Sequence, residues 1–467
     1  MLQKLINSVF GGKSKTAKPA RAKAPKTYDK AAHGIGREQL SRGALQTVEG
    51  LARAGFEAYV VGGAVRDLLL GLPPKDFDVA TNATPDQVHA TFRRSRLIGR
   101  RFRIVHVLFG SETVEVSTFR TADVKEAETD AHGRVLRDNT FGDIVNDAAR
   151  RDFTINAIYY DAATESVIDY HGGVGDLRKK VLRIIGDAET RYREDPVRML
   201  RVARFAAKLG FAIDPKTRAA IPTVAPLLSN VPSSRLFDEM IKMLLSGHAV
   251  AAVKQLRGEG LHHGLLPMLD VILEQPMGEK FVMLALARTD ERILLGKGVA
   301  PGFLFAALLW HEVLKTWNEM KTKGEHSMPA LYEAMNVVLD TQTEKLAINR
   351  RFVADMREIW SVQPRFERMN GRTPFKLLEH PRFRAAYDFM LLRAESGEID
   401  REIGDWWTRF YDAAADERNE MTIAAPAGGG EQKKRRRRRR APGKDGEAAG
   451  VTDASSAGGS ATDSGGD

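Results

Sequence analysis

Cysteine is absent from this chain of 467 residues. Its absence excludes disulfide bonds, thiolate zinc sites and a cysteine nucleophile, and it fits a reducing compartment, so a cytoplasmic location is expected. Long apolar runs are also lacking: no stretch of about 18 uninterrupted apolar residues occurs, and no transmembrane helix is expected. Polar side chains interrupt the first residues too often for a secretory signal.

The net charge of +10 is concentrated at the two ends of the chain. Residues 1–30 contain eight Lys or Arg and a single Asp, and residues 431–467 contain nine Lys or Arg against six Asp or Glu. The part between them is therefore neutral. Basic ends of this kind indicate a polyanionic partner, either nucleic acid or anionic lipid, although they can also serve only to keep a protein soluble.

The length of the chain predicts two or more domains. Strand and helix patterns alternate in the first part, and only helical spacing follows. The predicted fold class is α+β: a mixed α/β head with a small β-sheet, then an all-α region, between disordered basic termini. The predicted boundaries are a basic arm at 1–37, the head at 38–185, helical regions at 186–250 and 251–420, and an arginine-rich tail at 421–467 that holds the run Lys433–Arg440. The amphipathic start LQKLINSVF adds peripheral membrane contact as a hypothesis.

The segment VGGAVRDLLLGLPPKDFDVAT, residues 61–81, combines two glycines with two nearby acids. Gly62 and Gly63 follow a predicted strand and precede a predicted helix, and backbone N–H groups at such a junction can bind a phosphate. Arg66, in the first turn of that helix, adds a positive charge for the same phosphate. The alternative is a tight turn that needs glycine only for its backbone conformation.

Asp76 and Asp78 lie on either side of Phe77 in a predicted strand. Alternation then places both carboxylates on one face and Phe77 in the core. Two neighbouring carboxylates repel each other unless a cation lies between them, and Mg²⁺ prefers such oxygen ligands. Glu115, on the later strand TVEVSTF, is predicted to face the same side and to complete a site for two metal ions. The alternative is a glutamate that only faces solvent.

The segment RRDFTINAIYYD, residues 150–161, is predicted to be a helix. Asp152 and Asn156 are four residues apart and would share one helical face. A carboxylate and an amide together can bind ribose hydroxyls, while Arg151 beside them can bind phosphate. The alternative role for Asp152 is to cap the helix.

The segment REDPVRMLRVARFAAKLG, residues 193–210, predicts a helix with Asp195 as its cap and Pro196 as its first residue. Arg198, Arg201 and Arg204 recur every three residues and form a basic stripe. Asp195 and Arg198 could read the edge of a nucleobase through paired hydrogen bonds. The alternative is an ion pair between these two residues within the helix.

In this order, the motifs resemble those of the class II tRNA nucleotidyltransferase/poly(A) polymerase family, within the DNA polymerase β superfamily. The resemblance is carried by Gly62-Gly63-x-Val65-Arg66-Asp67, Asp76-Phe77-Asp78, Arg150-Arg151-Asp152-Phe153-Thr154-x-Asn156-Ala157 and Glu194-Asp195-Pro196-x-Arg198. It implies a nucleotidyltransferase head followed by helical neck, body and leg. The stretches Leu97–Gly110 and Leu377–Glu395, with the arginine-rich tail, are similar to the bacterial poly(A) polymerases of this family.

The resemblance implies that Asp76 and Asp78 bind the catalytic metal ions and that Asp152 is a further catalytic acid near the ribose. Glu115 stays a candidate third ligand. The residues expected to bind the nucleotide are Gly62, Gly63, Arg66, Arg151, Asn156, Glu194, Asp195 and Arg198, of which the last three would recognise the base.

The implied reaction is the addition of AMP from ATP to RNA 3′ ends, with Mg²⁺, or alternatively Mn²⁺, as cofactor. The expected protein is a monomer whose partners are RNA, ATP and proteins of RNA decay. Two other functions stay open: a CCA-adding tRNA nucleotidyltransferase and, in a different class, a catalytically inactive RNA-binding adaptor. No His-Asp dipeptide occurs, so the HD phosphohydrolase domain of some CCA-adding relatives is not expected.

Overall fold

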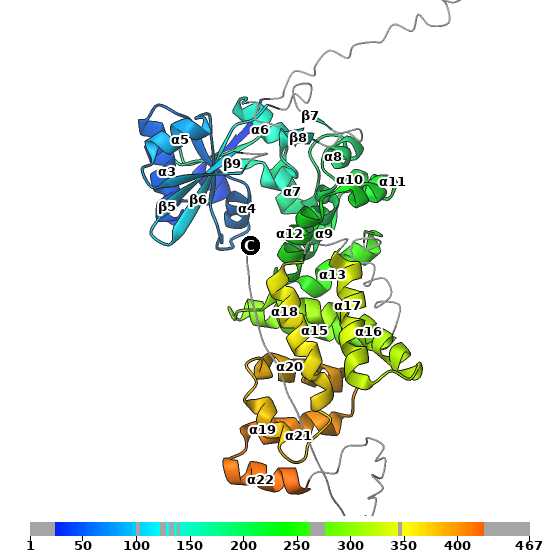
Figure 1. The fold of residues 1–467 in the computed structure, drawn as a ribbon. Helices are drawn as coiled ribbons and strands as arrows, with labels where there is room; N and C mark the ends of the chain where they lie inside the picture. Colours follow the sequence, from blue (N-terminus) through cyan, green and yellow to red (C-terminus); the bar gives the residue numbers. More distant parts are fainter. Residues whose placement is uncertain are drawn as a thin grey trace, which may run out of the picture.

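The computed structural model describes residues 24–99, 103–121, 128–129, 135–137, 141–261, 276–343 and 348–424. Most of the predicted basic arm and nearly all of the predicted tail lie outside the described residues. A head built on a sheet stands at one end of the molecule, and helices extend away from it in one direction (Figure 1). The predicted fold class, a mixed head followed by helices, is confirmed.

The head is built on an eight-stranded sheet with the order β1-β10-β9-β2-β3-β6-β5-β4. Neighbouring strands are antiparallel except β3 and β6, which run parallel. The strands are β1 (Lys26–Tyr28), β2 (Ala58–Val61), β3 (Asp78–Thr81), β4 (Ser95–Ile98), β5 (Ile104–Phe109), β6 (Glu112–Thr118), β9 (Ile158–Asp161) and β10 (Ser166–Asp169). A separate antiparallel pair is formed by β7 (Glu128–Thr129) and β8 (Val135–Arg137).

Apolar side chains cover both faces of the main sheet. Val60 and Val79 belong to the main core, whereas their neighbours Val61 and Ala80 pack in a smaller cluster with Ala148, which lies on a helix. Adjacent residues of a strand point to opposite faces, so the two clusters lie on opposite sides of the sheet. The head helices are α2 (Lys30–His33), α3 (Arg42–Arg53), α4 (Gly63–Leu69), α5 (Pro85–Thr91), α6 (Ile144–Arg150) and α7 (Gly173–Lys179), with 3₁₀ turns η1 (Arg37–Gln39) and η3 (Thr154–Asn156).

The basic arm is shorter than predicted, and the sheet is larger. Residues 26–28, placed in the arm by the sequence, form β1 and pair with β10. Helix α2 follows, capped by the Asp29 side chain. The arm prediction was therefore wrong for these residues, because backbone pairing to a sheet edge leaves no periodic signal in so short a strand.

The predicted helix over residues 150–161 was also wrong. Helix α6 ends at Arg150, a single 3₁₀ turn follows, and β9 begins at Ile158. Tyr159 and Tyr160 are fully buried in that strand between β2 and β10. Aromatic residues pack well on a sheet, and this tertiary burial overrides the helical spacing.

The helical part begins after β11 (Val181–Leu182), and β12 (Ala212–Ile213), which follows the second helix of that part, pairs with β11 in parallel. Nearest the head lie α8 (Ala188–Glu194), α9 (Val197–Leu209), α10 (Pro215–Ala219), α11 (Ile221–Val224), η4 (Ala225–Asn230), α12 (Ser233–Leu244) and α13 (Ala249–Gly258). The middle holds α15 (Pro276–Leu294), α16 (Pro301–Thr322), α17 (Ser327–Thr343) and α18 (Arg350–Val362). The far end holds η5 (Gln363–Arg365), α19 (Thr373–Leu378), α20 (Phe383–Ser396), α21 (Arg401–Asp412) and α22 (Ala415–Ala424).

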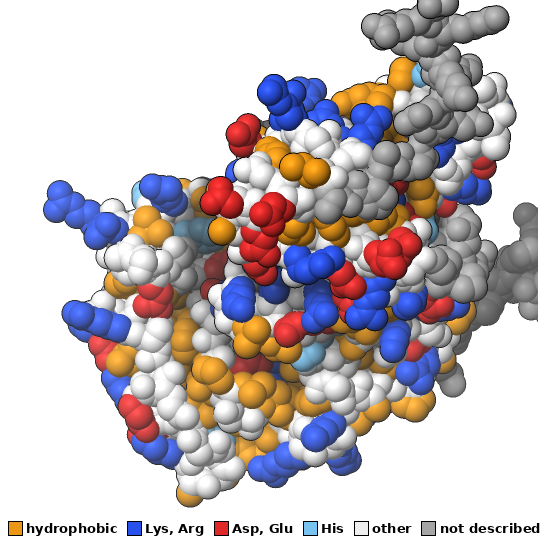
Figure 2. Space-filling model, turned by 90° about the horizontal axis from the view of Figure 1, so that it is seen from below, with side chains coloured by type: hydrophobic (Ala, Val, Ile, Leu, Met, Phe, Trp, Pro, Cys, Tyr) orange, Lys and Arg blue, Asp and Glu red, His pale blue; other side chains and the backbone are white. Residues whose placement is uncertain are grey.

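One hydrophobic core runs from the head into the middle helices, and a second lies at the far end around Phe366 and Trp407. The predicted domain boundaries stay predictions. Seen from below, Lys and Arg side chains are spread over the surface and interspersed with acidic ones (Figure 2). Among the described helices, none has both the length and the apolar character to cross a membrane.

Candidate active site

A cleft of about 450 Å³ lies where the head meets helices α9 and α12. Most of the predicted site residues line it. The head contributes Gly62, Gly63, Asp78, Arg151, Asp152 and Asn156, and the helices contribute Asp195, Val197, Arg198, Arg201, Arg235, Asp238, Glu239 and Lys242. Arg66, Asp76, Glu115 and Glu194 do not line the cleft but lie next to residues that do.

The two glycines occupy the predicted junction between a strand and a helix. Strand β2 ends at Val61, Gly62 has a φ of +78°, and α4 begins at Gly63. A side chain at Gly62 would lie 3.6 Å from Arg151 Nη1 and 3.9 Å from Asp78 Oδ2. Glycine at this position therefore has two effects. It permits the positive φ, and it leaves open the space between Arg151 and Asp78.

The acids lie at the start of β3, but not as the sequence predicted. Only Asp78 belongs to the strand, and Asp76 precedes it, so the argument that alternation places both on one face was wrong. Phe77 is buried in the core, as predicted. Strand β6 lies parallel to β3 with Glu115 opposite Asp78, which places these two side chains on the same face.

The pKa of Asp78 is raised, in part by neighbouring acids. Partial desolvation in the cleft and the nearby Glu115 and Asp76 raise its pKa to about 6, against the opposing charge of Arg151. Glu115 also lies 3.8 Å from His106 Nε2. A carboxylate whose pKa is raised by neighbouring acids favours a bound cation, so the surroundings of Asp78 fit a divalent metal ion.

Within the described residues, no group of three or more His, Asp or Glu side chains is close enough together to hold a metal ion. The predicted set of Asp76, Asp78 and Glu115 is therefore not assembled as a three-acid group. Mg²⁺ is commonly bound by one or two carboxylates together with substrate phosphates. The roles of Asp76, Asp78 and Glu115 as metal ligands stay predictions.

Arg151 is fixed at the cleft by two partners behind it. Its Nε donates to Asp147 Oδ2 and to Tyr159 Oη, both at 3.1 Å, and Tyr159 Oη donates to the same carboxylate at 2.7 Å. Burial lowers the pKa of Arg151, but Tyr159 and Asp147 outweigh it and raise that pKa. The guanidinium is thus held, fully charged, beside Gly62 and Asp78.

Asp152 and Asn156 are brought together as predicted, although the segment is not a helix. Asn156 Nδ2 donates to Asp152 Oδ1 at 3.2 Å. Arg201 donates from Nε and Nη2 to Asp152 Oδ2 at 2.8 and 2.6 Å. Burial raises the pKa of Asp152, but the charge and hydrogen bonds of Arg201 outweigh it and leave that pKa lowered. The N-capping alternative for Asp152 fails, because Phe153 is the residue that precedes the 3₁₀ turn.

Arg66 lies behind the glycines rather than in the cleft. Its side chain is 4% exposed, and it donates to Asn156 Oδ1 at 2.7 Å and to Asp67 Oδ1 at 2.8 Å. A side chain at Gly63 would lie 3.6 Å from Arg66 Nη2. The predicted direct contact of Arg66 with phosphate stays untested, and the contacts present here make it a support for Asn156.

The predicted base-reading residues lie at the end of α8 and the start of α9, with different partners from those expected. Asp195 does not cap the helix, which begins at Val197; its Oδ2 accepts a hydrogen bond from Arg235 Nη2 at 2.9 Å. Arg198 Nη1 donates to Glu194 Oε2 at 3.0 Å and to the Arg191 carbonyl at 2.7 Å. The expected alternative, an ion pair between Asp195 and Arg198, stays a prediction.

Sequence reasoning missed several residues that line the cleft or lie next to residues that do. Arg191 donates to Glu194 Oε2 at 2.6 Å, and burial together with Arg198 lowers the pKa of Arg191 to about 10. The Nε of Arg191 and the Nη1 of Arg235 are buried without a hydrogen-bond partner among the described atoms. The polar positions Arg235, Asp238, Glu239 and Lys242 of α12 recur at helical spacing, and that stripe was the available signal.

Comparison with known proteins gives the same assignment from three separate segments of the chain. Residues 58–183 match the poly A polymerase head domain, residues 210–273 the probable RNA and SrmB-binding site of polymerase A, and residues 323–441 the polymerase A arginine-rich C-terminus. The solved CCA-adding enzyme in complex with ATP has a TM-score of 0.55 at 18% identity and covers 82% of this chain and 87% of that one. At this identity the likeness shows the fold alone.

Curated relatives extend the similarity over most of the chain. Poly(A) polymerase I of Salmonella typhi is 46% identical over 406 residues, 83% of this chain and 86% of the relative. Poly(A) polymerase I of Haemophilus influenzae is 42% identical over 423 residues, 87% of this chain and 93% of the relative. The CCA-adding enzyme of Lactobacillus delbrueckii subsp. bulgaricus is 40% identical, but over only 47% of this chain. The chain belongs to the poly(A) polymerase I family.

Proposed function

We propose that this chain adds AMP from ATP to RNA 3′ ends without a nucleic-acid template and releases pyrophosphate. It is a polynucleotide adenylyltransferase of the poly(A) polymerase I family. The observation that carries the proposal is that one cleft is lined both by a predicted metal-binding acid and by predicted base-recognition residues. Asp78 lies on the head side, and Asp195 and Arg198 lie on the helical side. A nucleotide bound between them would have its phosphates at the acid and its base at α9.

Each part of the nucleotide has a proposed set of contacts. Gly62, Gly63 and Arg151 would bind the phosphates, since they offer backbone N–H groups and a fixed guanidinium. Asp152 and Asn156 would bind the ribose. Glu194, Asp195 and Arg198 would recognise adenine, because a wrong base would leave their buried polar atoms unpaired.

In the proposed step, the RNA 3′ oxygen attacks the α-phosphorus of ATP. A phosphodiester bond forms, the bond to pyrophosphate breaks, and the hydroxyl proton passes to water. A divalent cation held by Asp76 and Asp78 would neutralise phosphate charge and acidify the 3′-hydroxyl, with Mg²⁺ proposed and Mn²⁺ as the alternative. The chain's own contribution is position and fixed charge, so no histidine is needed as acid or base.

The identity of the added nucleotide tests the proposal. Purified protein is incubated with a short RNA and each of the four nucleoside triphosphates separately, with Mg²⁺. Long extension with ATP alone is expected. One or two additions from CTP would indicate a CCA-adding enzyme instead, and no incorporation of any nucleotide would indicate an RNA-binding adaptor.

Replacement of the two aspartates tests the site itself. Asp76→Ala and Asp78→Ala should each lower the rate of adenylation by at least roughly 100-fold, because charge stabilisation at the reacting phosphate is lost. Asp86→Ala is the matched control, since Asp86 is an exposed head acid paired with Arg103. Retained adenylation by both alanine variants, with unchanged melting temperatures, would overturn the assignment.

The remaining partner predictions are proposals as well. We keep a monomeric state, proteins of RNA decay as partners, peripheral membrane contact through the N-terminal residues, and a cytoplasmic location. The residues on which the membrane contact depends lie outside the described part of the chain. Sedimentation of the pure protein alone tests the monomeric state, and sedimentation with anionic vesicles tests the membrane contact.

A further inference from the structure

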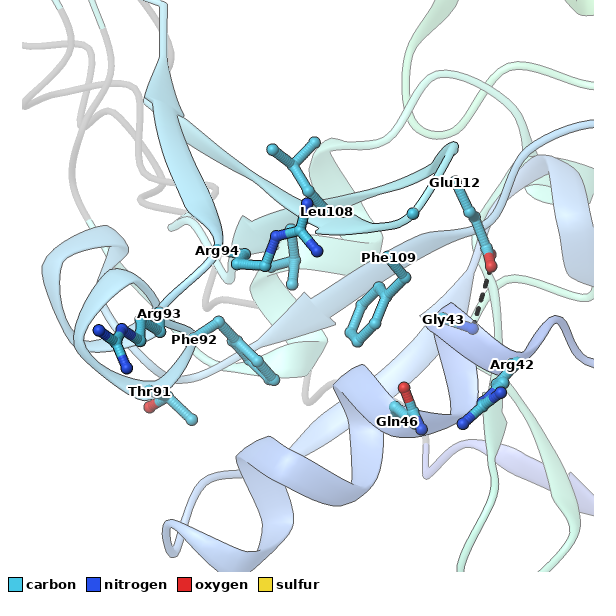
Figure 3. A pocket seen from close by; sticks show the side chains of 12 residues that line it. Arg42, Gly43, Gln46, Thr91, Phe92, Arg93, Arg94, Leu108, Phe109 and Glu112 are labelled. Carbon is cyan, nitrogen blue, oxygen red and sulfur yellow. Dashed lines mark hydrogen bonds between the residues drawn. The ribbon is translucent and has the colours of Figure 1, made fainter.

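The head contains a second hollow, of about 580 Å³, built by α3, the end of α5 and the turn between β5 and β6 (Figure 3). Phe109 and Glu112 are paired across that turn, and each is an even number of residues from the buried Val107 and Val114. They therefore share the core face of the sheet, whereas Glu115 lies on the opposite face. The sheet separates this hollow from the active-site acids.

The hollow carries an excess of positive charge. Arg42, Arg93 and Arg94 line it, and none of the three has an acidic partner among the described residues. Glu112 is the acid that lines the hollow, and its Oε2 accepts a hydrogen bond from the Gly43 amide at 3.1 Å. Arginines that lack acidic partners and surround a concave surface attract a phosphate group.

Two aromatic rings line the same hollow. Phe92 lies so close to α3 that a side chain at Gly50 would meet its ring at 2.8 Å, so the glycine lets the ring rest on the helix. Phe109 approaches from the β5–β6 side, and Gln46 lies on α3 below Phe109 in the view (Figure 3). Half-buried rings beside an amide offer a flat apolar contact and hydrogen bonds, the two features by which a nucleobase is bound.

We propose that this hollow is a second nucleotide-binding site. Arg42 and Arg94 would bind the phosphate, and Phe92, Phe109 and Gln46 would contact the base. The ligand is either a free mononucleotide or one nucleotide of an RNA strand, since both present the same chemistry. No catalytic step is assigned to the site, and its existence does not depend on the proposed activity.

Photocrosslinking on the full chain tests this site without turnover. The protein is irradiated in EDTA with 8-azido-AMP, with 8-azido-ATP, or with a short oligoadenylate that carries one 8-azidoadenosine, and the labelled peptides are identified by mass spectrometry. Labelling of the peptide that contains Phe92 or the one that contains Phe109 is expected. Labelling by the mononucleotides alone identifies a free nucleotide as the ligand, and labelling by the oligoadenylate alone identifies the RNA strand.

The double variant Arg42→Ala/Arg94→Ala should weaken binding at the hollow about 100-fold, through the loss of two charge-assisted contacts. Arg96→Ala is the matched control, because Arg96 is an exposed arginine on the adjacent β4 that does not line the hollow. Labelling of cleft peptides in the same samples reports on the active site separately. The proposal is overturned if no probe labels these peptides, or if the double variant is labelled as strongly as the unaltered protein.

Discussion

At the residue scale, hydrogen bonds to both carboxylate oxygens hold Asp152 in place. One oxygen accepts two hydrogen bonds from Arg201, and the other accepts from Asn156. Arg201 was visible in the sequence only as part of a stripe. The fold places Arg201 next to Asp152, and there it pairs with the candidate catalytic acid.

The pairing of Asp152 makes a prediction about stability and pH. The pKa of Asp152 is lowered in the folded protein, so its ionised form stabilises the fold above the unfolded pKa of about 4, and this contribution is lost as pH falls through the folded pKa. Asp152→Asn should be about 2 kcal/mol less stable at pH 7, and the difference should shrink below about pH 4.

Urea unfolding of both proteins over a pH series measures this difference. Asp86→Asn is the control, because Asp86 is 70% exposed and should make no comparable contribution. A difference between Asp152→Asn and the unaltered protein that stays constant down to the acid limit would contradict the role given to Arg201.

At the scale of elements, the cleft depends on the contact between α9 and α12. Arg235 of α12 donates to Asp195, which precedes α9, and Glu239 of the same helix accepts from Arg204 at 2.6 Å. These bonds hold α9 and the residue before it against α12, which also lines the cleft. The position of Asp195, a proposed base-recognition residue, therefore depends on α12.

Removal of the Arg235 side chain should loosen this position. Arg235→Ala is expected to raise the KM for ATP and to lower the preference for ATP over CTP by about 10- to 100-fold, because Asp195 loses its fixed partner. Steady-state kinetics with each nucleotide measure the change, and Lys254→Ala, an exposed lysine of α13, is the control. An unchanged ATP preference would show that Asp195 is positioned without Arg235.

A buried polar network joins α16 to α20. Glu398 accepts from Trp310 Nε1 at 2.9 Å and from Arg393 Nε at 2.7 Å, and Arg393 also donates to Gln363 at 3.2 Å. Burial lowers the pKa of the adjacent His311, which keeps it neutral next to this ion pair. The network connects the middle helices to the far end through buried hydrogen bonds.

Breaking this network should destabilise the helical part. Glu398→Ala leaves Arg393 buried without its carboxylate and is expected to cost about 3–5 kcal/mol. Glu395→Ala is the matched control, since Glu395 is 50% exposed and pairs with Arg288 at the surface. Thermal unfolding compares the two, and equal melting temperatures would mean that the buried pair contributes nothing.

At the scale of the whole molecule, the head and the helices carry different parts of the proposed activity. The proposed chemistry lies at the junction. On the face seen from below, basic and acidic side chains are interspersed (Figure 2). The concentrated positive charge lies instead in the run Lys433–Arg440, outside the described residues. We therefore expect the tail to supply much of the non-specific affinity for RNA.

Deletion of residues 431–467 tests this expectation. The truncated chain should bind RNA more weakly, with a smaller dependence on salt, because phosphates neutralised by the basic run are no longer contacted. It should make shorter tails while still adding single nucleotides. Filter binding over a salt series and gel analysis of the products provide the two measurements, and unchanged tail length would remove the tail from this role.

The sequence by itself determined the class of the fold and the candidate residues of the site. Glycines at a strand–helix junction, paired acids and the residues of α9 were all identified, because such motifs are local and their spacing is visible in the chain. Only the tertiary structure decided their partners: Arg201 for Asp152, Arg235 for Asp195, Asn156 for Arg66. It also decided that residues 158–161 form a strand and that Asp76 stands outside one. Long-range burial and pairing fix these features, and their free energy depends on residues far apart in the sequence that no local pattern records.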